Sequence, residues 1–89
     1  MRTSGPHSEN MPYELKLEQI APEMEYGTVT RWLRSEGDRI GAGELIVEIE
    51  AEKASHEVES PVAGVIESLV AAEGDELKVG DVLAVIATD

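Results

Sequence analysis

The sequence predicts an all-β domain, a closed sandwich or flattened β-barrel (barrel-sandwich hybrid) of two antiparallel sheets related by a pseudo-twofold axis. Three observations support this fold class. Apolar residues alternate with polar ones, turn signals recur at short intervals, and a shift of 37 residues aligns one half of the chain with the other. A period of two is typical of strands with one buried face, and no segment carries the apolar stripe of an amphipathic helix.

The expected elements follow in chain order. Residues 1–10 are polar and aperiodic, so we expect a disordered leader or a cloning remnant there and a folded domain over residues 11–89. The inward residues of the predicted strands are Leu15 and Leu17, then Leu45, Val47, Ile49 and Ala51, and later Val82, Ala84 and Ile86. Turn segments containing glycine or proline separate the strands, at 36–38, 41–43, 60–61, 73–75 and 80–81.

An internal repeat organises these elements. Residues 27–50 align with residues 64–87 without a gap, and six positions are identical, where chance gives about one or two. The identical pairs are Gly27 and Gly64, Glu36 and Glu73, Gly37 and Gly74, Asp38 and Asp75, Gly43 and Gly80, and Ile49 and Ile86. Two copies are too few for a solenoid, so we expect two halves packed face to face.

The repeat also indicates where a functional group could project. The first half continues into a second alternating stretch, residues 56–62, which makes residues 52–55 the tip of a hairpin. A shift of 37 residues from this tip leads to the chain ends, so the ends occupy the symmetry-related position in the fold. The hairpin should therefore lie at the end of the domain opposite both termini. Of the lysines Lys16, Lys53 and Lys78, only Lys53 is predicted to project from this tip. The ordinary alternative is a solvated turn lysine.

Composition narrows the function classes. The chain has 89 residues, 19 acidic and 7 basic side chains, a net charge of −12 and no cysteine. Without cysteine there is no disulfide framework, thiolate zinc site or cysteine nucleophile. The negative charge argues against nucleic acid and anionic lipid as partners and fits a basic protein partner better. No apolar run is long enough to span a bilayer.

Other candidate motifs are weak. His7 and His56 are far apart and lack a third ligand, so we expect no metal site. The glycines between residues 37 and 43 lack the lysine and hydroxyl of a phosphate-binding loop, and their repetition indicates turns. Trp32 is expected in the core, with a partner-facing role as the alternative.

Residues 48–86, EIEAEKASHEVESPVAGVIESLVAAEGDELKVGDVLAVI, resemble the lipoyl domain of the dihydrolipoyl acyltransferase component of 2-oxo acid dehydrogenase complexes. The resemblance extends over residues 12–88 and includes Gly27, Trp32 and the Glu36-Gly37-Asp38 turn. In that family a lysine between an acidic residue and alanine, usually Asp-Lys-Ala, carries lipoate in amide linkage at a hairpin tip. This chain reads Glu52-Lys53-Ala54, a departure at the acidic position.

The resemblance implies a function and its residues. Lys53 would carry covalent lipoate, Glu52 and Ala54 would be recognised by the modifying enzyme, and Gly37 and Gly64 would be the family's structural turn or recognition glycines. The domain would be a non-catalytic swinging arm of a 2-oxo acid or acetoin dehydrogenase complex, cytoplasmic in a bacterium or mitochondrial in a eukaryote. Its partners would be a thiamine-diphosphate-dependent dehydrogenase, the acyltransferase core, dihydrolipoyl dehydrogenase, and lipoate ligase or lipoyl/octanoyl transferase.

Two alternative functions stay open. Biotinyl carrier domains share the fold and the repeat but place their lysine between methionines, which Glu52 and Ala54 do not match. An unmodified lipoyl-like interaction or scaffold module is the second alternative, and it would carry neither group.

Acidic residues are expected to surround Lys53. Alternation places Glu48, Glu50 and Glu52 on one face of their strand, and Glu57 and Glu59 share a face on the return strand. One interpretation is a solvated surface that keeps an exposed hairpin from pairing with other chains. The other is a partner-docking surface that steers the hairpin toward a basic protein.

Overall fold

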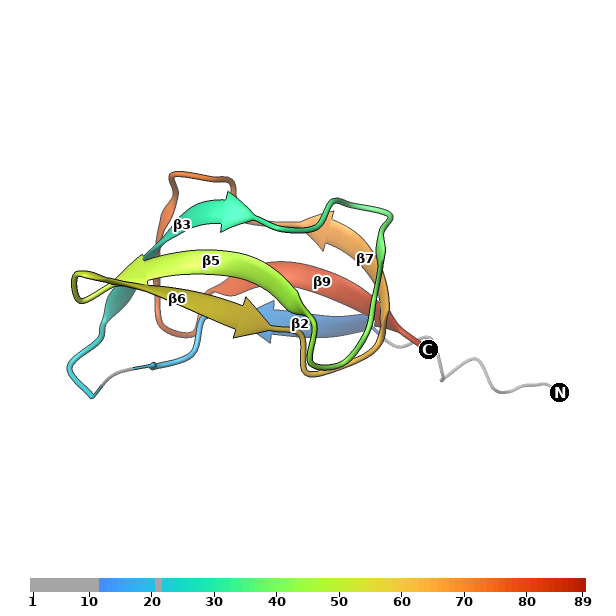
Figure 1. The fold of residues 1–89 in the computed structure, drawn as a ribbon, viewed down its shortest axis with the longest axis horizontal. Helices are drawn as coiled ribbons and strands as arrows, with labels where there is room; N and C mark the ends of the chain where they lie inside the picture. Colours follow the sequence, from blue (N-terminus) through green and yellow to red (C-terminus); the bar gives the residue numbers. More distant parts are fainter. Residues whose placement is uncertain (1–11, 21) are drawn as a thin grey trace, which may run out of the picture.

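The computed structural model describes residues 12–20 and 22–89, and these residues form an all-β domain (Figure 1). The predicted leader, residues 1–10, lies outside the described residues. The strands are β2 (Pro12–Lys16), β3 (Tyr26–Trp32), β4 (Arg39–Ile40), β5 (Leu45–Ala51), β6 (Ala54–Glu59), β7 (Gly64–Leu69), β8 (Glu76–Lys78) and β9 (Val82–Thr88). No helix of the described part is long and apolar enough to cross a membrane.

The strands form two four-stranded sheets, in the orders β2-β9-β7-β4 and β6-β5-β3-β8. Every pairing between neighbouring strands is antiparallel. The two sheets face each other across a single apolar core, which confirms the predicted flattened barrel.

The predicted pseudo-twofold symmetry is present down to individual hydrogen bonds. A 37-residue shift converts β3 into β7, β4 into β8 and β5 into β9, while β6 and β2 occupy the matching outer positions of their sheets. Each half also bonds to the other. Gly37 N donates to Ile66 O at 2.7 Å, and its symmetry mate Gly74 N donates to Val29 O at 2.7 Å. The halves are therefore interlocked rather than merely packed together.

The repeated Glu-Gly-Asp segments make these cross-connections. Glu36 Oε2 accepts a hydrogen bond from Leu69 N at 2.9 Å, and Glu73 Oε2 accepts one from Trp32 N at 2.9 Å. The glycine of each segment has a positive φ, 91° at Gly37 and 95° at Gly74, which a side chain would strain. The identity of the segments thus reflects both turn geometry and a carboxylate that reaches the opposite half.

The core follows the predicted alternation with one correction. Leu45 and Val82, which alternation placed inside, are only half-buried, and their neighbours Ile46 and Leu83 are fully buried. The register shifts between Leu45 and Val47, and again where β2 meets β9. A bulge of this kind inserts one residue and reverses which face the following side chains occupy. Trp32 is half-buried against the core, and its indole Nε1 donates to Ala71 O at 2.8 Å.

The same topology separates the β5–β6 hairpin from the chain ends. The β5–β6 turn lies at one end of the long axis, and β2 begins and β9 ends at the other (Figure 1). Pro12 is paired with Ala87 near the chain end, just as Ala54 is paired with Ala51 at the hairpin tip. The predicted placement of the hairpin opposite the termini is therefore confirmed for the described residues.

Candidate functional site

The β5–β6 hairpin ends in a two-residue turn. Ala51 pairs with Ala54, and the residues between them, Glu52 and Lys53, have φ values of 53° and 65°. Two successive left-handed residues are the signature of a type I′ turn, whose twist matches that of the strands. Left-handed conformations cost a non-glycine residue about 1–2 kcal/mol. The turn thus holds two side-chain-bearing residues where glycine or asparagine is usual, and such strain tends to persist at functional sites.

Lys53 is exposed at this turn. It takes part in none of the ion pairs formed among residues 12–20 and 22–89. By contrast, Nζ of Lys16 forms an ion pair with Oε1 of Glu14, at a distance of 4.0 Å. Lys78 ends strand β8 and is paired across the sheet with Tyr26. Of these three lysines, Lys53 is the one at the projecting tip of the hairpin.

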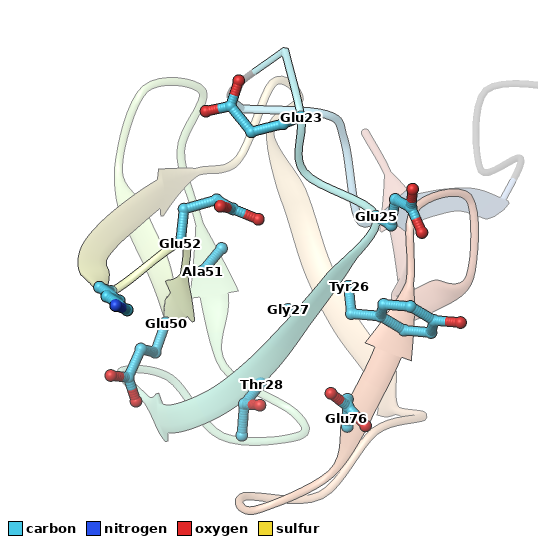
Figure 2. A pocket seen from close by; sticks show the side chains of 10 residues that line it. Glu23, Glu25, Tyr26, Gly27, Thr28, Glu50, Ala51, Glu52 and Glu76 are labelled. Atoms are coloured by element: carbon cyan, nitrogen blue, oxygen red, sulfur yellow. The ribbon is translucent and has the colours of Figure 1, made fainter.

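A shallow depression of about 400 Å³ adjoins Lys53. Figure 2 shows Glu50 and Glu52 on one side of it and Tyr26 with Glu25 on the other. Its complete lining is Glu23, Glu25, Tyr26, Gly27, Thr28, Glu50, Ala51, Glu52, Lys53 and Glu76. Five carboxylates thus share this surface with Lys53, which makes it strongly attractive to cations.

The predicted acidic residues lie largely where alternation placed them. Glu48 is paired with Glu57, Glu50 with Ser55, and Glu59 with Leu45, so the four glutamates share the outer face of their sheet. We call Glu48, Glu50, Glu57 and Glu59 the acidic collar. Glu52 lies in the turn rather than in β5, and it lines the depression beside Lys53 together with Glu50.

The two predicted glycines have different structural roles. Gly37 lies in a turn with positive φ, in agreement with a turn role. Gly64 is the first residue of β7 and is not a turn residue. A Cβ there would collide with the backbone of Ala87 and lie 2.9 Å from the Cα of Thr88. Gly64 therefore permits β7 to approach β9 closely, and it lies at the terminal end of the domain rather than near Lys53.

Sequence reasoning missed the far side of the depression. Glu23 and Glu25 precede β3, Tyr26 begins β3 and Glu76 begins β8, and all four are well separated from Lys53 along the chain. No motif marks them, because their proximity to the hairpin arises from the sheet order β6-β5-β3-β8. No group of three or more His, Cys, Asp or Glu within the described ranges is arranged to hold a metal ion.

Comparison with known proteins agrees with this geometry. The family model Biotin_lipoyl, described as biotin-requiring enzyme, matches residues 13–86. The pyruvate dehydrogenase E1 component subunit beta of Rhizobium meliloti is 42% identical over 80 residues, and the dihydrolipoyllysine-residue succinyltransferase component of the 2-oxoglutarate dehydrogenase complex of Staphylococcus saprophyticus is 42% identical over 73 residues. These matches cover 89% and 82% of the chain but only 17% of either relative.

Two solved structures share the fold. The solution structure of the lipoyl domain of the 2-oxoglutarate dehydrogenase complex from Azotobacter vinelandii aligns with a TM-score of 0.69 and 33% identity, covering 85% of this chain and 95% of that domain. The urea carboxylase of Kluyveromyces lactis aligns with a TM-score of 0.73 and 24% identity, covering 97% of this chain and 7% of that protein. The second similarity is one of fold alone.

Proposed function

The chain belongs to the family of biotinyl and lipoyl carrier domains, and from this premise we propose that it carries lipoate in amide linkage on Lys53. The domain is a non-catalytic carrier, and Lys53 serves as an attachment point rather than as an acid or a base. The observation that supports this most directly is the position of a free, exposed lysine at the strained type I′ turn that ends the hairpin.

The turn suits a covalent arm for physical reasons. A two-residue turn between paired strands is rigid, so the lysine Cα has a defined position while its side chain remains free to rotate. The amide forms when Nζ loses a proton and attacks the activated lipoate carboxyl, with ATP cleaved to AMP and pyrophosphate if a ligase performs the activation. Lys53 is unpaired among the described residues, so no ion pair has to break first.

The chain's composition fits the cofactor. When bound, lipoate supplies a disulfide that accepts an acyl group and two electrons as a 2-oxo acid loses carbon dioxide, a reaction for which this cysteine-free chain has no sulfur of its own. A group on a long arm at a rigid tip visits several active sites at high effective concentration. The residues of the chain therefore hold the base of the arm in a defined position and leave the arm free to enter those active sites.

Lipoate fits better than biotin. The neighbours of Lys53 are Glu52 and Ala54, whereas biotinyl domains place methionines beside their lysine. The solved lipoyl domain is 33% identical to this chain, while the urea carboxylase, at 24%, shares only the fold.

The proposed partners are those that the resemblance to lipoyl domains implies. They are a thiamine-diphosphate-dependent dehydrogenase, an acyltransferase core, dihydrolipoyl dehydrogenase, and a lipoate ligase or a lipoyl/octanoyl transferase. We propose that the acidic collar steers the hairpin toward basic surfaces on these enzymes, since Glu48, Glu50, Glu57 and Glu59 share one outer face. Association should then slow as salt rises, and equal rates at low and high ionic strength would refute the steering role.

The central test is the intact mass of the protein after incubation with lipoate, ATP and a lipoate ligase. We expect one lipoyl adduct on the wild type, one on Lys78→Arg and none on Lys53→Arg. A wild type without an adduct, or an adduct that persists in Lys53→Arg, would refute the proposal. Streptavidin binding after expression with biotin ligase would instead indicate a biotinyl carrier, and absence of both groups would indicate a scaffold module.

A further inference from the structure

Tyr26 is an exposed aromatic residue in a chain with only two others. Tyr13 and Trp32 pack against the core, but Tyr26 is 46% exposed. It begins β3, and its side chain borders the same depression as Lys53 (Figure 2). No residue within 12–20 or 22–89 forms a hydrogen bond with its hydroxyl group. Neither core packing nor internal hydrogen bonding therefore explains why tyrosine is present.

The internal symmetry allows the residues near Lys53 to be compared with those at equivalent positions of the other half, which have the same backbone structure. On the outer face near Lys53, Glu50, Thr28 and Glu76 form one cross-strand row. The symmetry-related residues form the equivalent cross-strand row in the other sheet, which consists of Ala87, Val65 and Arg39. The mate of Tyr26 is Ala63.

The same backbone thus carries two different surfaces. The row near the chain termini has two small apolar residues and an arginine that is already paired with Asp89 at 2.9 Å. The row near Lys53 has two carboxylates and a hydroxyl, and Tyr26 lies beside it on β3. Because the fold tolerates alanine, valine and arginine at these positions, the fold does not dictate the acidic residues and tyrosine near Lys53.

We propose that Tyr26, Thr28, Glu50 and Glu76, here named the tyrosine face, dock the thiamine-diphosphate-dependent dehydrogenase through a cationic side chain at the rim of its active site. This inference rests on the proposed function, since it is the use of Lys53 that brings such an enzyme to this end of the domain. An arginine of the enzyme packs on the Tyr26 ring and pairs with the carboxylates around it.

The chemistry of the face favours a cation of this kind. A guanidinium group stacks on an aromatic ring and binds carboxylates in the same plane, which a compact ammonium group does less well. Tyrosine and arginine are also enriched among the residues that dominate interface energies. Lys78, the cross-strand partner of Tyr26, is not among the residues that line the depression.

The first test measures binding without lipoate. The ¹⁵N-labelled unmodified domain is titrated with the pyruvate dehydrogenase component of Rhizobium meliloti and with the 2-oxoglutarate dehydrogenase component of Azotobacter vinelandii. We expect amide signals of Tyr26, Thr28, Glu50 and Glu76 to broaden with at least one enzyme, while those of Val65 and Ala87 stay sharp. Broadening centred on the opposite sheet, or no binding by either enzyme, would overturn the proposal.

The second test uses variants of the lipoylated domain as substrate for the enzyme that binds. Tyr26→Ala should raise KM about tenfold with kcat unchanged, and Tyr26→Phe should retain near wild-type KM because the ring remains. Glu76→Gln should raise KM about threefold, whereas Glu14→Gln, which makes the same change of charge on the opposite sheet, should leave KM unaltered.

The outcomes separate the two proposals. A wild type that is lipoylated and turned over, with a KM for Tyr26→Ala within twofold of its own, refutes the docking face and leaves the carrier function intact. A wild type that takes no lipoate but still binds through the tyrosine face refutes the carrier function alone. If Tyr26→Ala lowers lipoylation by the ligase as much as it raises KM, the tyrosine acts on the hairpin tip and the docking assignment is wrong.

Discussion

Replacing the two symmetry-related glycines by alanine should have unequal effects on stability. At Gly64 a new Cβ would collide with the Ala87 carbonyl oxygen and lie 2.9 Å from the Thr88 Cα, all backbone atoms of β9. At Gly27 the closest atoms are side-chain carbons, Ile49 Cγ2 at 2.9 Å and Met24 Cε at 3.2 Å. Side chains can shift by a few tenths of an ångström, whereas a strand moves only by losing ladder hydrogen bonds.

The expected magnitudes follow from these contacts. Overpacking a well-packed core costs about 1–3 kcal/mol, and we expect Gly27→Ala to cost about 1–2 kcal/mol. For Gly64→Ala, separation of β7 from β9 adds the loss of two or so hydrogen bonds, about 1 kcal/mol each, against a gain of about 0.5–1 kcal/mol from replacing a strand glycine. We therefore expect Gly64→Ala to cost about 2–4 kcal/mol, more than Gly27→Ala and a large part of the stability of a small domain.

Urea unfolding followed by Trp32 fluorescence measures both values, because this single tryptophan is half-buried against the core. The free energies of unfolding should rank wild type above Gly27→Ala and Gly27→Ala above Gly64→Ala, with similar m-values. A Gly64→Ala loss below about 1 kcal/mol, or a loss smaller than that of Gly27→Ala, would refute the argument that backbone approach decides the cost.

Substitutions at three further positions probe the fold. Glu73→Ala should lower the free energy of unfolding by about 1 kcal/mol, because it removes the acceptor for Trp32 N. Glu73→Gln keeps an amide oxygen at that place and should lower it less. A urea titration that ranks the two variants the other way would contradict the role of this hydrogen bond in connecting the halves. Glu52→Gly should stabilise the folded domain by about 1 kcal/mol and so raise its melting temperature, because glycine adopts φ near 53° without strain. A lower melting temperature would contradict the idea that the turn is strained. Glu57→Gln should stabilise the domain by a few tenths of a kcal/mol at low salt by relieving repulsion from Glu48, an effect that should vanish in high salt.

Local patterns were sufficient for most of the architecture. Period-two alternation identified strands, and the gapless alignment of residues 27–50 with 64–87 predicted two halves packed face to face, because equivalent residues in a repeat occupy equivalent environments. The failures have local causes. Alternation misplaced Leu45 and Ile46 because a bulge adds a residue that no sequence period reveals.

The amino-acid sequence alone determined the fold class, the repeat, the hairpin and the position of Lys53 at its tip, since each depends on residues that are close in the chain or related by a constant shift. Only the tertiary structure decided what surrounds Lys53. Tyr26 and Glu76 reach it because β3 lies between β5 and β8, and strand order depends on packing of the whole core. Only the tertiary structure, likewise, shows why residue 64 is glycine. The backbone of β9, about twenty residues further along the chain, leaves no space for a Cβ there.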